Sequence, residues 1–234
     1  IAAQIASLTA SVKSYQDSMD RAMNRTQPWE ELSTVGSSSQ MSTAFNRISQ
    51  MAQAYRTKGC ELEGNAALLK DTKDALKLML ENRYNAQIEK YYDNWWDWEI
   101  GCTRPLMNAV LLLYSELDQE TIAKAVAAID RFVPDPTKCY QQKNVATGAN
   151  LVWVCQAVAL RGIAGKDAGR IEAAKNALTP VFAYVTQEDG YYEDGSFIQH
   201  SYFAYTGGYG ASLLSELSKL MYLLGGSAWE VTDP

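Results

Sequence analysis

Apolar residues recur at spacings of three and four along most of this chain, and this periodicity predicts amphipathic helices. Within residues 1–23, for example, Ile5, Leu8 and Val12 fall on one helical face. Alternation typical of strands is confined to about 181–203. The fold class is therefore predicted as all-α, with antiparallel helical hairpins as the economical arrangement. Further helices are predicted over residues 38–57, 66–83, 103–117, 118–132, 148–164, 167–178 and 209–224.

The ends of several helices carry their own signals. Asn65 and Asp118 are residue types that cap helix N-termini, so each is expected to cap the helix that follows it. Pro134 and the pair Gly225-Gly226 mark two C-terminal ends.

Composition narrows the class of protein. The 234 residues are 47% hydrophobic and 21% charged, as in a globular chain. A net charge of −6 and a pI of about 4.9 argue against a protein that binds nucleic acid. The longest apolar run, Ala109 to Tyr114, is too short to cross a membrane. Ile1 is not a natural start residue, so the sequence is compatible with a secretion signal that has been removed.

The cysteines give no metal signature. Four cysteines at irregular spacing and one histidine do not make a zinc ligand set, so no metal site is expected. Three segments interrupt the helical pattern, at 91–102, 133–150 and 186–210. They are rich in Trp, Tyr, Asn, Gly and Asp, and segments of this kind are where a helical scaffold builds a site.

The first of these segments gathers three of the six tryptophans into residues 95–98, directly after Asn94. One interpretation is an aromatic platform on which sugar rings stack. The other is a helix start whose tryptophans belong to the core. Trp95 and Trp96 are adjacent and cannot both face one core from a helix, which favours exposure of at least one of them.

The other two segments offer an amide and a histidine–tyrosine pair. Asn150 lies near the N-terminus of the helix predicted over 148–164, where it either caps the helix or donates hydrogen bonds to a ligand oxygen. His200 is the only histidine, and two glycines in the intervening segment allow a sharp turn that brings Tyr209 close to it. A lone histidine is more often structural than catalytic. A tyrosine, with a pKa near 10, is a poor base unless its anion is stabilised.

At these positions the chain resembles polysaccharide lyase family 8, which contains hyaluronate, chondroitin AC and xanthan lyases. The resemblance rests on six motifs in the expected order, and the first 90 residues add only a compatible helical pattern. The motifs are NWWDWEIG at 94–101, FVPDP at 132–136, TGAN at 147–150, DGSFIQH at 194–200, AYTGGYG at 204–210 and WEVTDP at 229–234.

The resemblance implies a fold and a setting. Residues 1–234 would form one catalytic domain, an incomplete α/α toroid of helical hairpins that is truncated on its C-terminal side. Large β-sandwich domains of the same protein would follow, with arginines and a glutamate that complete the cleft. A secreted bacterial monomer that acts on acidic polysaccharide is implied, with no nucleic-acid or membrane partner.

The resemblance also implies roles for particular residues. Asn150 would bind the uronate carboxylate, and His200 and Tyr209 would be the catalytic pair. The polymer-binding residues would be Asn94, Trp95, Trp96 and Arg104, although the order Thr-Arg-Pro around Arg104 departs from the more usual Pro-Arg.

The implied reaction is β-elimination. Asn150 would stabilise the enolate-like carboxylate, and Tyr209, ionised with help from its surroundings, would take the C5 proton with His200 assisting. No metal or organic cofactor is needed. Hyaluronan or chondroitin is the first expectation for the substrate and xanthan the second.

Two other classes of function remain as alternatives. A non-catalytic carbohydrate-binding domain would use the tryptophans alone. A glycoside hydrolase would need two opposed carboxylates, and the acids at 189, 193 and 194 have no evident partner.

Overall fold

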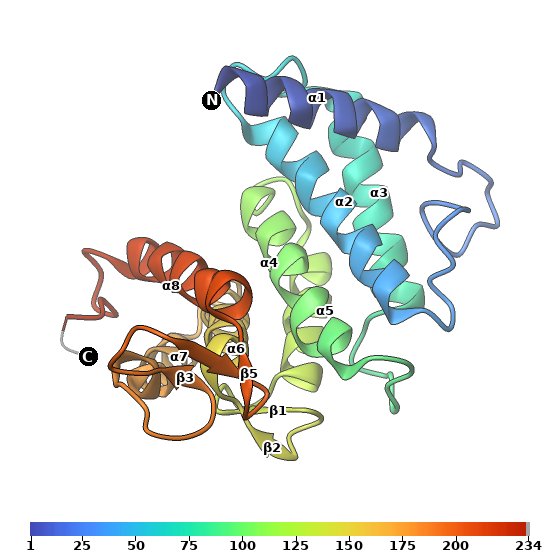
Figure 1. Cartoon of the computed structure of the whole chain (residues 1–234). Helices are drawn as coiled ribbons and strands as arrows, with labels where there is room; N and C mark the ends of the chain where they lie inside the picture. The colour runs from blue at the N-terminus through green and yellow to red at the C-terminus, as the bar shows by residue number, and fades with distance from the viewer. Residues whose placement is uncertain (233–234) are drawn as a thin grey trace. The chain divides into compact units, whose positions relative to one another are not determined.

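The computed structural model describes residues 1–232. Asp233 and Pro234, the last two residues of the WEVTDP motif, lie outside the described part. The chain forms two compact units, Ile1–Phe132 and a second unit that begins at Val133 (Figure 1). Both units are mainly helical, as the periodicity predicts.

The first unit is organised around α2. This helix contacts α1, α3 and α4, and α5 packs against α3 and α4. Its centre is an aromatic cluster in which the Tyr84 ring lies 4.4 Å from Phe132, 5.5 Å from Phe45 and 5.8 Å from Trp98, between ring centroids. All four rings are fully buried. The elements are α1 (Ala2–Asp17), α2 (Ser38–Arg56), α3 (Ala66–Asn82), the π-helical turn η1 (Asp97–Gly101), α4 (Thr103–Leu112) and α5 (Gln119–Phe132).

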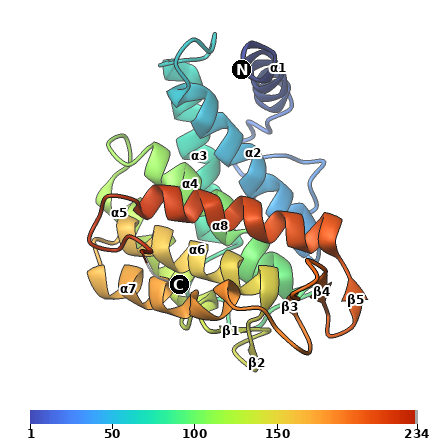
Figure 2. The ribbon, with the colours of Figure 1, turned by 60° about the vertical axis from the view of Figure 1, so that its left-hand side comes forward.

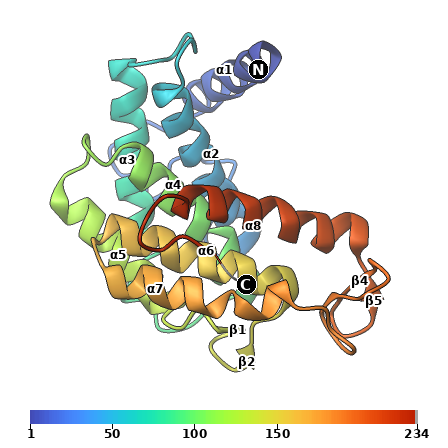
Figure 3. The ribbon, with the colours of Figure 1, turned by 90° about the vertical axis from the view of Figure 1, so that its left-hand side faces the viewer.

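The second unit is organised around α6 (Gly148–Ala164), which lies between α7 (Ala168–Ala177) and α8 (Ala211–Leu224) (Figures 2 and 3). Because α6 is apolar on nearly all sides, it must be covered on nearly all sides. Gly162 lets α7 approach closely, since a Cβ there would lie 2.7 Å from the Ile171 side chain.

Short strands and turns complete the second unit. One antiparallel pair joins β1 (Lys138–Cys139) to β2 (Asn144–Val145). A three-stranded antiparallel sheet has the order β3 (Gly190–Tyr191), β4 (Phe197–Gln199), β5 (Phe203–Ala204). The remaining elements are the 3₁₀ turn η2 (Thr179–Phe182) and the π-helical turn η3 (Thr206–Gly210), which leads into α8.

Most helix boundaries agree with the sequence prediction to within two residues, but two helices end early. The first was expected to reach residue 23 and stops at Asp17. There the Tyr15 carbonyl accepts from the Trp29 indole at 2.8 Å, and the chain turns away. The helix expected over 103–117 stops at Leu112 and continues as turns. The β1–β2 pair also lies outside the segment where strands were expected.

Both predicted caps are confirmed. The Asn65 side chain accepts from the Leu68 amide at 2.9 Å, and the Asp118 carboxylate accepts from the Thr121 amide at 2.7 Å. All four cysteines are buried, and none of them forms a disulfide.

Candidate active site

The Tyr209 ring lies in an aromatic cluster of the second unit. Its centroid is 5.1 Å from the His200 ring, 5.1 Å from Tyr205 and 5.7 Å from Trp153. The His200 and Tyr205 rings meet Tyr209 edge to face, at interplanar angles of 82° and 70°. Trp153 is buried, Tyr209 is half-buried, and His200 and Tyr205 are exposed. The predicted proximity of His200 and Tyr209 is therefore confirmed.

Backbone geometry produces this closeness. Gln199 pairs with Phe203, so His200 and Ser201 lie in the loop that joins β4 to β5. Both have left-handed backbones, with φ of 57° and 66°. On the other side, Gly210 permits close packing, because a Cβ there would lie 3.0 Å from the Phe197 side chain. A three-residue loop and a glycine-rich π turn thus bring the two rings together.

Asn150 lies inside the first turn of α6, not at its cap. Thr147 occupies the N-cap position, so the interpretation of Asn150 as an N-cap is wrong. The Asn150 side chain is 8% exposed, and its Oδ1 is buried with no hydrogen-bond partner. An unsatisfied buried polar atom costs about 1–3 kcal/mol. Such atoms recur at functional sites, which makes this amide a candidate for ligand binding.

Asn150 and the His200–Tyr209 pair belong to one region of the second unit. Asn150 and Trp153 are three residues apart on α6 and therefore share a helix face. Trp153 contacts the Tyr209 ring, which in turn contacts His200. The helix also contacts η3 and β4 directly. Trp153 and Tyr205 were not selected from the sequence, although an aromatic one turn after Asn150 is a signal that could have identified Trp153.

Electrostatics around Tyr209 favour its neutral form. Burial raises the pKa of the Tyr209 hydroxyl above its usual value, and nearby Tyr205 and Asp189 raise it further. This differs from the expectation that the surroundings help Tyr209 to ionise. The physical cause is that these neighbours withdraw water from the phenolate or repel its charge.

The tryptophan segment lies in the first unit, where its rings have different environments. Trp98 is fully buried, and its indole donates to the Tyr92 carbonyl at 2.9 Å. Trp95 and Trp96 are half-buried, and Asn94 is exposed. The Asn94 side chain accepts from the Trp96 amide at 3.1 Å, which fixes the start of the segment. Trp98 thus belongs to the core, whereas Trp95 and Trp96 are partly exposed.

Arg104 lies in the first turn of α4 and is half-buried. It belongs to the first unit, together with Asn94, Trp95 and Trp96. The structure thus assigns the predicted polymer-binding residues to one unit and the predicted catalytic residues to the other.

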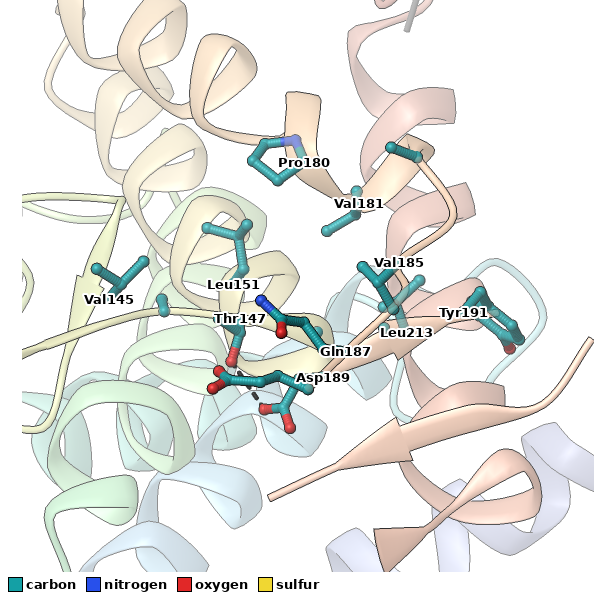
Figure 4. A pocket seen from close by; sticks show the side chains of 15 residues that line it. Val145, Thr147, Leu151, Pro180, Val181, Val185, Gln187, Asp189, Tyr191 and Leu213 are labelled. Carbon is teal, nitrogen blue, oxygen red and sulfur yellow. Dashed lines mark hydrogen bonds between the residues drawn. The ribbon is translucent and has the colours of Figure 1, made fainter. Parts of the chain in front are cut away.

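A pocket of about 280 Å³ opens in the second unit (Figure 4). The carboxylate of Asp189 lies beside the Thr147 hydroxyl, which donates to it at 2.8 Å. The apolar part of the wall includes Val145, Leu151, Val181, Val185 and Leu213. Carboxylates at the edge of an apolar wall repel the negatively charged uronate, so this pocket is not where we place the substrate.

Within residues 1–232, no three His, Cys, Asp or Glu side chains gather in a way that could hold a metal ion. None of the helices described there is long and apolar enough to cross a membrane.

Comparison with known proteins identifies relatives over the full length of the chain. Residues 1–234 match the description "Polysaccharide lyase family 8, N terminal alpha-helical domain". A xanthan lyase from Bacillus sp. (strain GL1) is 39% identical over 100% of this chain and 24% of that protein. A hyaluronate lyase from Thermasporomyces composti is 38% identical over 99% of this chain and 28% of that protein. The chain thus spans about a quarter of the length of these relatives.

Solved structures agree with the sequence relatives. A Paenibacillus xanthan lyase superimposes with a TM-score of 0.90 at 38% identity, covering 100% of this chain and 22% of that one. A Streptomyces coelicolor A3 chondroitin AC lyase, in complex with chondroitin sulphate, also gives a TM-score of 0.90 at 38% identity, covering 100% of this chain and 31% of that one. The helical fold, the order of the motifs and these relatives lead to one assignment: the chain belongs to polysaccharide lyase family 8.

Proposed function

We propose that this chain forms the catalytic helical part of a lyase that cleaves uronate-containing acidic polysaccharide, hyaluronan or chondroitin, by β-elimination. The observation that carries the proposal is the His200–Tyr209 ring pair, which Trp153 connects to the helix that bears Asn150. This elimination needs proton-transfer groups and an amide whose N–H groups can donate to the carboxylate. We take residues 1–234 to act as one catalytic domain.

Asn150 is assigned to the uronate carboxylate. It lies in the first turn of the 17-residue helix α6, where the helix dipole favours negative charge. When the C5 proton leaves, charge moves into the carboxylate and makes it enolate-like. Hydrogen bonds from the Asn150 amide would stabilise that charge more strongly as it develops, which lowers the barrier.

Tyr209 and His200 are assigned to proton transfer. Tyr209 would take the C5 proton and return a proton to the C4 glycosidic oxygen as the C4–O bond breaks and the C4=C5 double bond forms. The raised pKa of Tyr209 makes the neutral phenol its resting form, which suits the proton-donating step. The proton-accepting step needs positive charge nearby, and the arginines expected outside this chain would supply it. His200, exposed in the loop beside Tyr209, would orient the sugar and favour the tyrosinate.

The polymer-binding roles are assigned to the first unit. The half-buried rings of Trp95 and Trp96 would stack on sugar faces, Asn94 would contact hydroxyl groups, and Arg104 would attract an acidic group. The much longer relatives support the proposal that β-sandwich domains of the same protein complete the cleft. A polymeric acidic polysaccharide is a substrate found outside the cell, so we propose a secreted bacterial enzyme.

A second candidate substrate is xanthan. The Bacillus xanthan lyase supports this candidate, because it is 39% identical over the whole chain and so is as similar as the hyaluronate lyase, at 38%. The full-length protein should be incubated with hyaluronan, chondroitin and xanthan while the ultraviolet absorbance of the unsaturated uronate is followed. A rise on hyaluronan or chondroitin supports the first candidate. A rise on xanthan alone replaces it with the second, and no rise on any of the three contradicts both.

A further inference from the structure

We propose that Asp189 is a positioning residue that holds the His200 loop against the N-terminus of α6, and thereby sets His200 relative to Asn150. This inference rests on the proposed function for its catalytic consequence. The structural part stands on its own, because it concerns four hydrogen bonds among residues that the reaction does not use.

Three donors converge on the Asp189 carboxylate. The Thr147 hydroxyl donates to Oδ2 at 2.8 Å, and the Ser201 amide donates to Oδ1 at 2.7 Å. The Gln199 side-chain amide also donates to Oδ2. Two of these donors belong to the residues immediately before and after His200, and the third belongs to the N-cap residue of α6. One carboxylate thus ties both sides of the histidine to the helix that carries Asn150.

Gln199 extends the connection to the residue next to Asn150. Its side chain is completely buried, and its Oε1 accepts from the Ala149 amide at 3.1 Å. The side chain of Gln199 therefore has a fixed orientation, because its oxygen faces the backbone donor of α6 and its nitrogen faces Asp189. Buried polar groups of this kind specify a single arrangement when every partner is present.

Gly148 makes room for this arrangement. Its φ is +52°, and a Cβ at this position would lie 2.5 Å from Gln199 Oε1. The first residue of α6 therefore has to be glycine for Gln199 to reach the Ala149 amide. The contact between the histidine loop and the helix is thus specified from both sides.

The loop needs such support because its backbone is strained. His200 and Ser201 both have positive φ, and a left-handed residue costs about 1–2 kcal/mol. The hydrogen bond from the Ser201 amide to Asp189 fixes the second of these residues directly. Without an acceptor at 189, this loop has fewer constraints, and the His200 ring moves relative to Tyr209 and Asn150.

The test exchanges the hydrogen-bond donor and acceptor between the side chains at positions 189 and 199. Asp189→Asn replaces one carboxylate oxygen by an NH2 group, which opposes the Gln199 side-chain amide or, with the new side chain turned over, the Ser201 amide. Turning Gln199 over only moves the conflict to the Ala149 amide. Asp189→Asn combined with Gln199→Glu restores one acceptor facing Ala149 and one donor–acceptor pair between the two side chains. A misplacement of about 1 Å costs about 100-fold in rate. We expect Asp189→Asn to lower kcat by about that factor with KM little changed, and the double variant to regain most of the loss.

Glu188→Gln is the matched control, because it removes an equal charge one residue away from an exposed side chain. It should leave kcat and KM unchanged. An Asp189→Asn variant with unchanged kcat, or a double variant that is no better than Asp189→Asn, overturns the proposal. A single variant that fails to fold while the double variant folds supports it, and failure of both to fold overturns it.

A second readout separates this inference from the proposed function. The imidazole signals of His200 can be identified in the magnetic resonance spectrum as those lost in His200→Gln. Asp189→Asn should shift or broaden them, whereas Glu188→Gln and the double variant should not. This result is expected even if the wild-type protein cleaves none of the polysaccharides, which would contradict the proposed function alone. Unchanged His200 signals in Asp189→Asn would contradict the positioning role.

Discussion

The imidazole of His200 meets the Tyr209 ring edge to face, with 5.1 Å between ring centroids and 82° between the ring planes. His200 comes from the loop between two short strands, and Tyr209 comes from a π-helical turn before α8. Residues nine apart in sequence thus meet through two unusual backbone segments. Both segments lie within residues 186–210, one of the stretches that interrupt the helical pattern, and both carry the proposed chemistry.

Replacing Tyr209 by Phe should abolish most turnover and preserve the fold. The variant keeps the ring that packs against Trp153 and loses only the hydroxyl. Loss of a general acid–base group costs about 10²–10⁴ in kcat. Steady-state rates together with a calorimetric binding measurement check this expectation. A carbohydrate-binding domain without activity would show equal binding in both proteins and no turnover in either.

Replacing Asn150 by Ala should separate activity from stability. The lost amide should lower kcat by about 10²–10³, the usual cost of removing one stabilising donor. Stability should be unchanged or increased by about 1 kcal/mol, because the Asn150 oxygen has no partner to lose. Urea unfolding and steady-state kinetics measure the two quantities.

Asn65→Ala is the matched control for this prediction. Asn65 caps α3 through the Leu68 amide, so its loss should destabilise the protein by about 1 kcal/mol and leave kcat unchanged. Strong destabilisation by Asn150→Ala would show that this amide has a structural role instead.

The effects of replacing the tryptophans should depend on how deeply each ring is buried. Trp98→Ala removes a fully buried ring from the aromatic core and should cost about 3–5 kcal/mol of unfolding free energy. Trp95→Ala and Trp96→Ala remove half-buried rings and should mainly raise KM. The expected increase corresponds to a loss of about 1 kcal/mol of binding free energy per ring. Thermal unfolding and KM on the preferred polymer distinguish the two groups. An unchanged KM in both surface variants would remove the platform from the account.

The Asp71 carboxylate should make the unfolding free energy depend on pH in the acid range. Its carboxylate accepts from the Arg21 guanidinium at 2.8 Å and 3.1 Å and from the Gln16 amide at 2.9 Å. The Arg21 hydrogen bond is the largest favourable cause that holds the pKa of Asp71 below its usual value, and burial opposes it. A depressed folded-state pKa stabilises the fold above the unfolded-state pKa of about 3.9. That contribution is lost as the pH falls through the lower, folded-state value.

Asp71→Asn should therefore destabilise the protein at neutral pH by about 1–3 kcal/mol, and the difference from wild type should shrink at acid pH. Unfolding free energies measured by urea titration across this range provide the check. Asp74→Asn is the control, since the Lys70–Asp74 pair is exposed and should contribute little. A pH-independent difference for Asp71→Asn would contradict the assignment.

The sequence predicted the helices well because their signal is local. Spacing of apolar residues placed α2, α3 and α6 to within two residues, and the two expected caps formed. The end of α1 was missed, and a residue outside the predicted segment makes a contact there. Trp29 donates to the Tyr15 carbonyl, and no pattern within residues 1–23 records that contact.

The sequence identified the residues of the candidate site better than it predicted their local environment. The motifs selected Asn150, His200 and Tyr209, and the closeness of the last two followed from the glycines between them. The helix predicted over 148–164 contains Asn150, but the N-cap interpretation stayed open because Thr147 and Asn150 are both suitable caps by residue type, and Thr147 occupies the cap. The raised pKa of Tyr209 was missed, since it arises from burial and from neighbours that only the folded chain brings near.

The same reason hid the role of Asp189. In sequence it is one of several acids before His200, with nothing to distinguish it from its neighbours. The register of β3 against β4, in which Gly190 pairs with Ile198, brings Asp189 beside Gln199, and the loop after β4 turns the Ser201 amide to the same carboxylate. Tertiary contacts of this kind are the part of the site that local patterns do not encode.

The central claim is that Asn150, His200 and Tyr209 carry out a β-elimination on a uronate. Mass spectrometry of the products that the full-length protein forms from hyaluronan and chondroitin tests it most directly. The account predicts new non-reducing ends that carry a C4=C5 double bond and lack the elements of one water relative to hydrolysis products, and their loss in Tyr209→Phe. Products that have gained water, or unsaturated products undiminished in Tyr209→Phe, would contradict it.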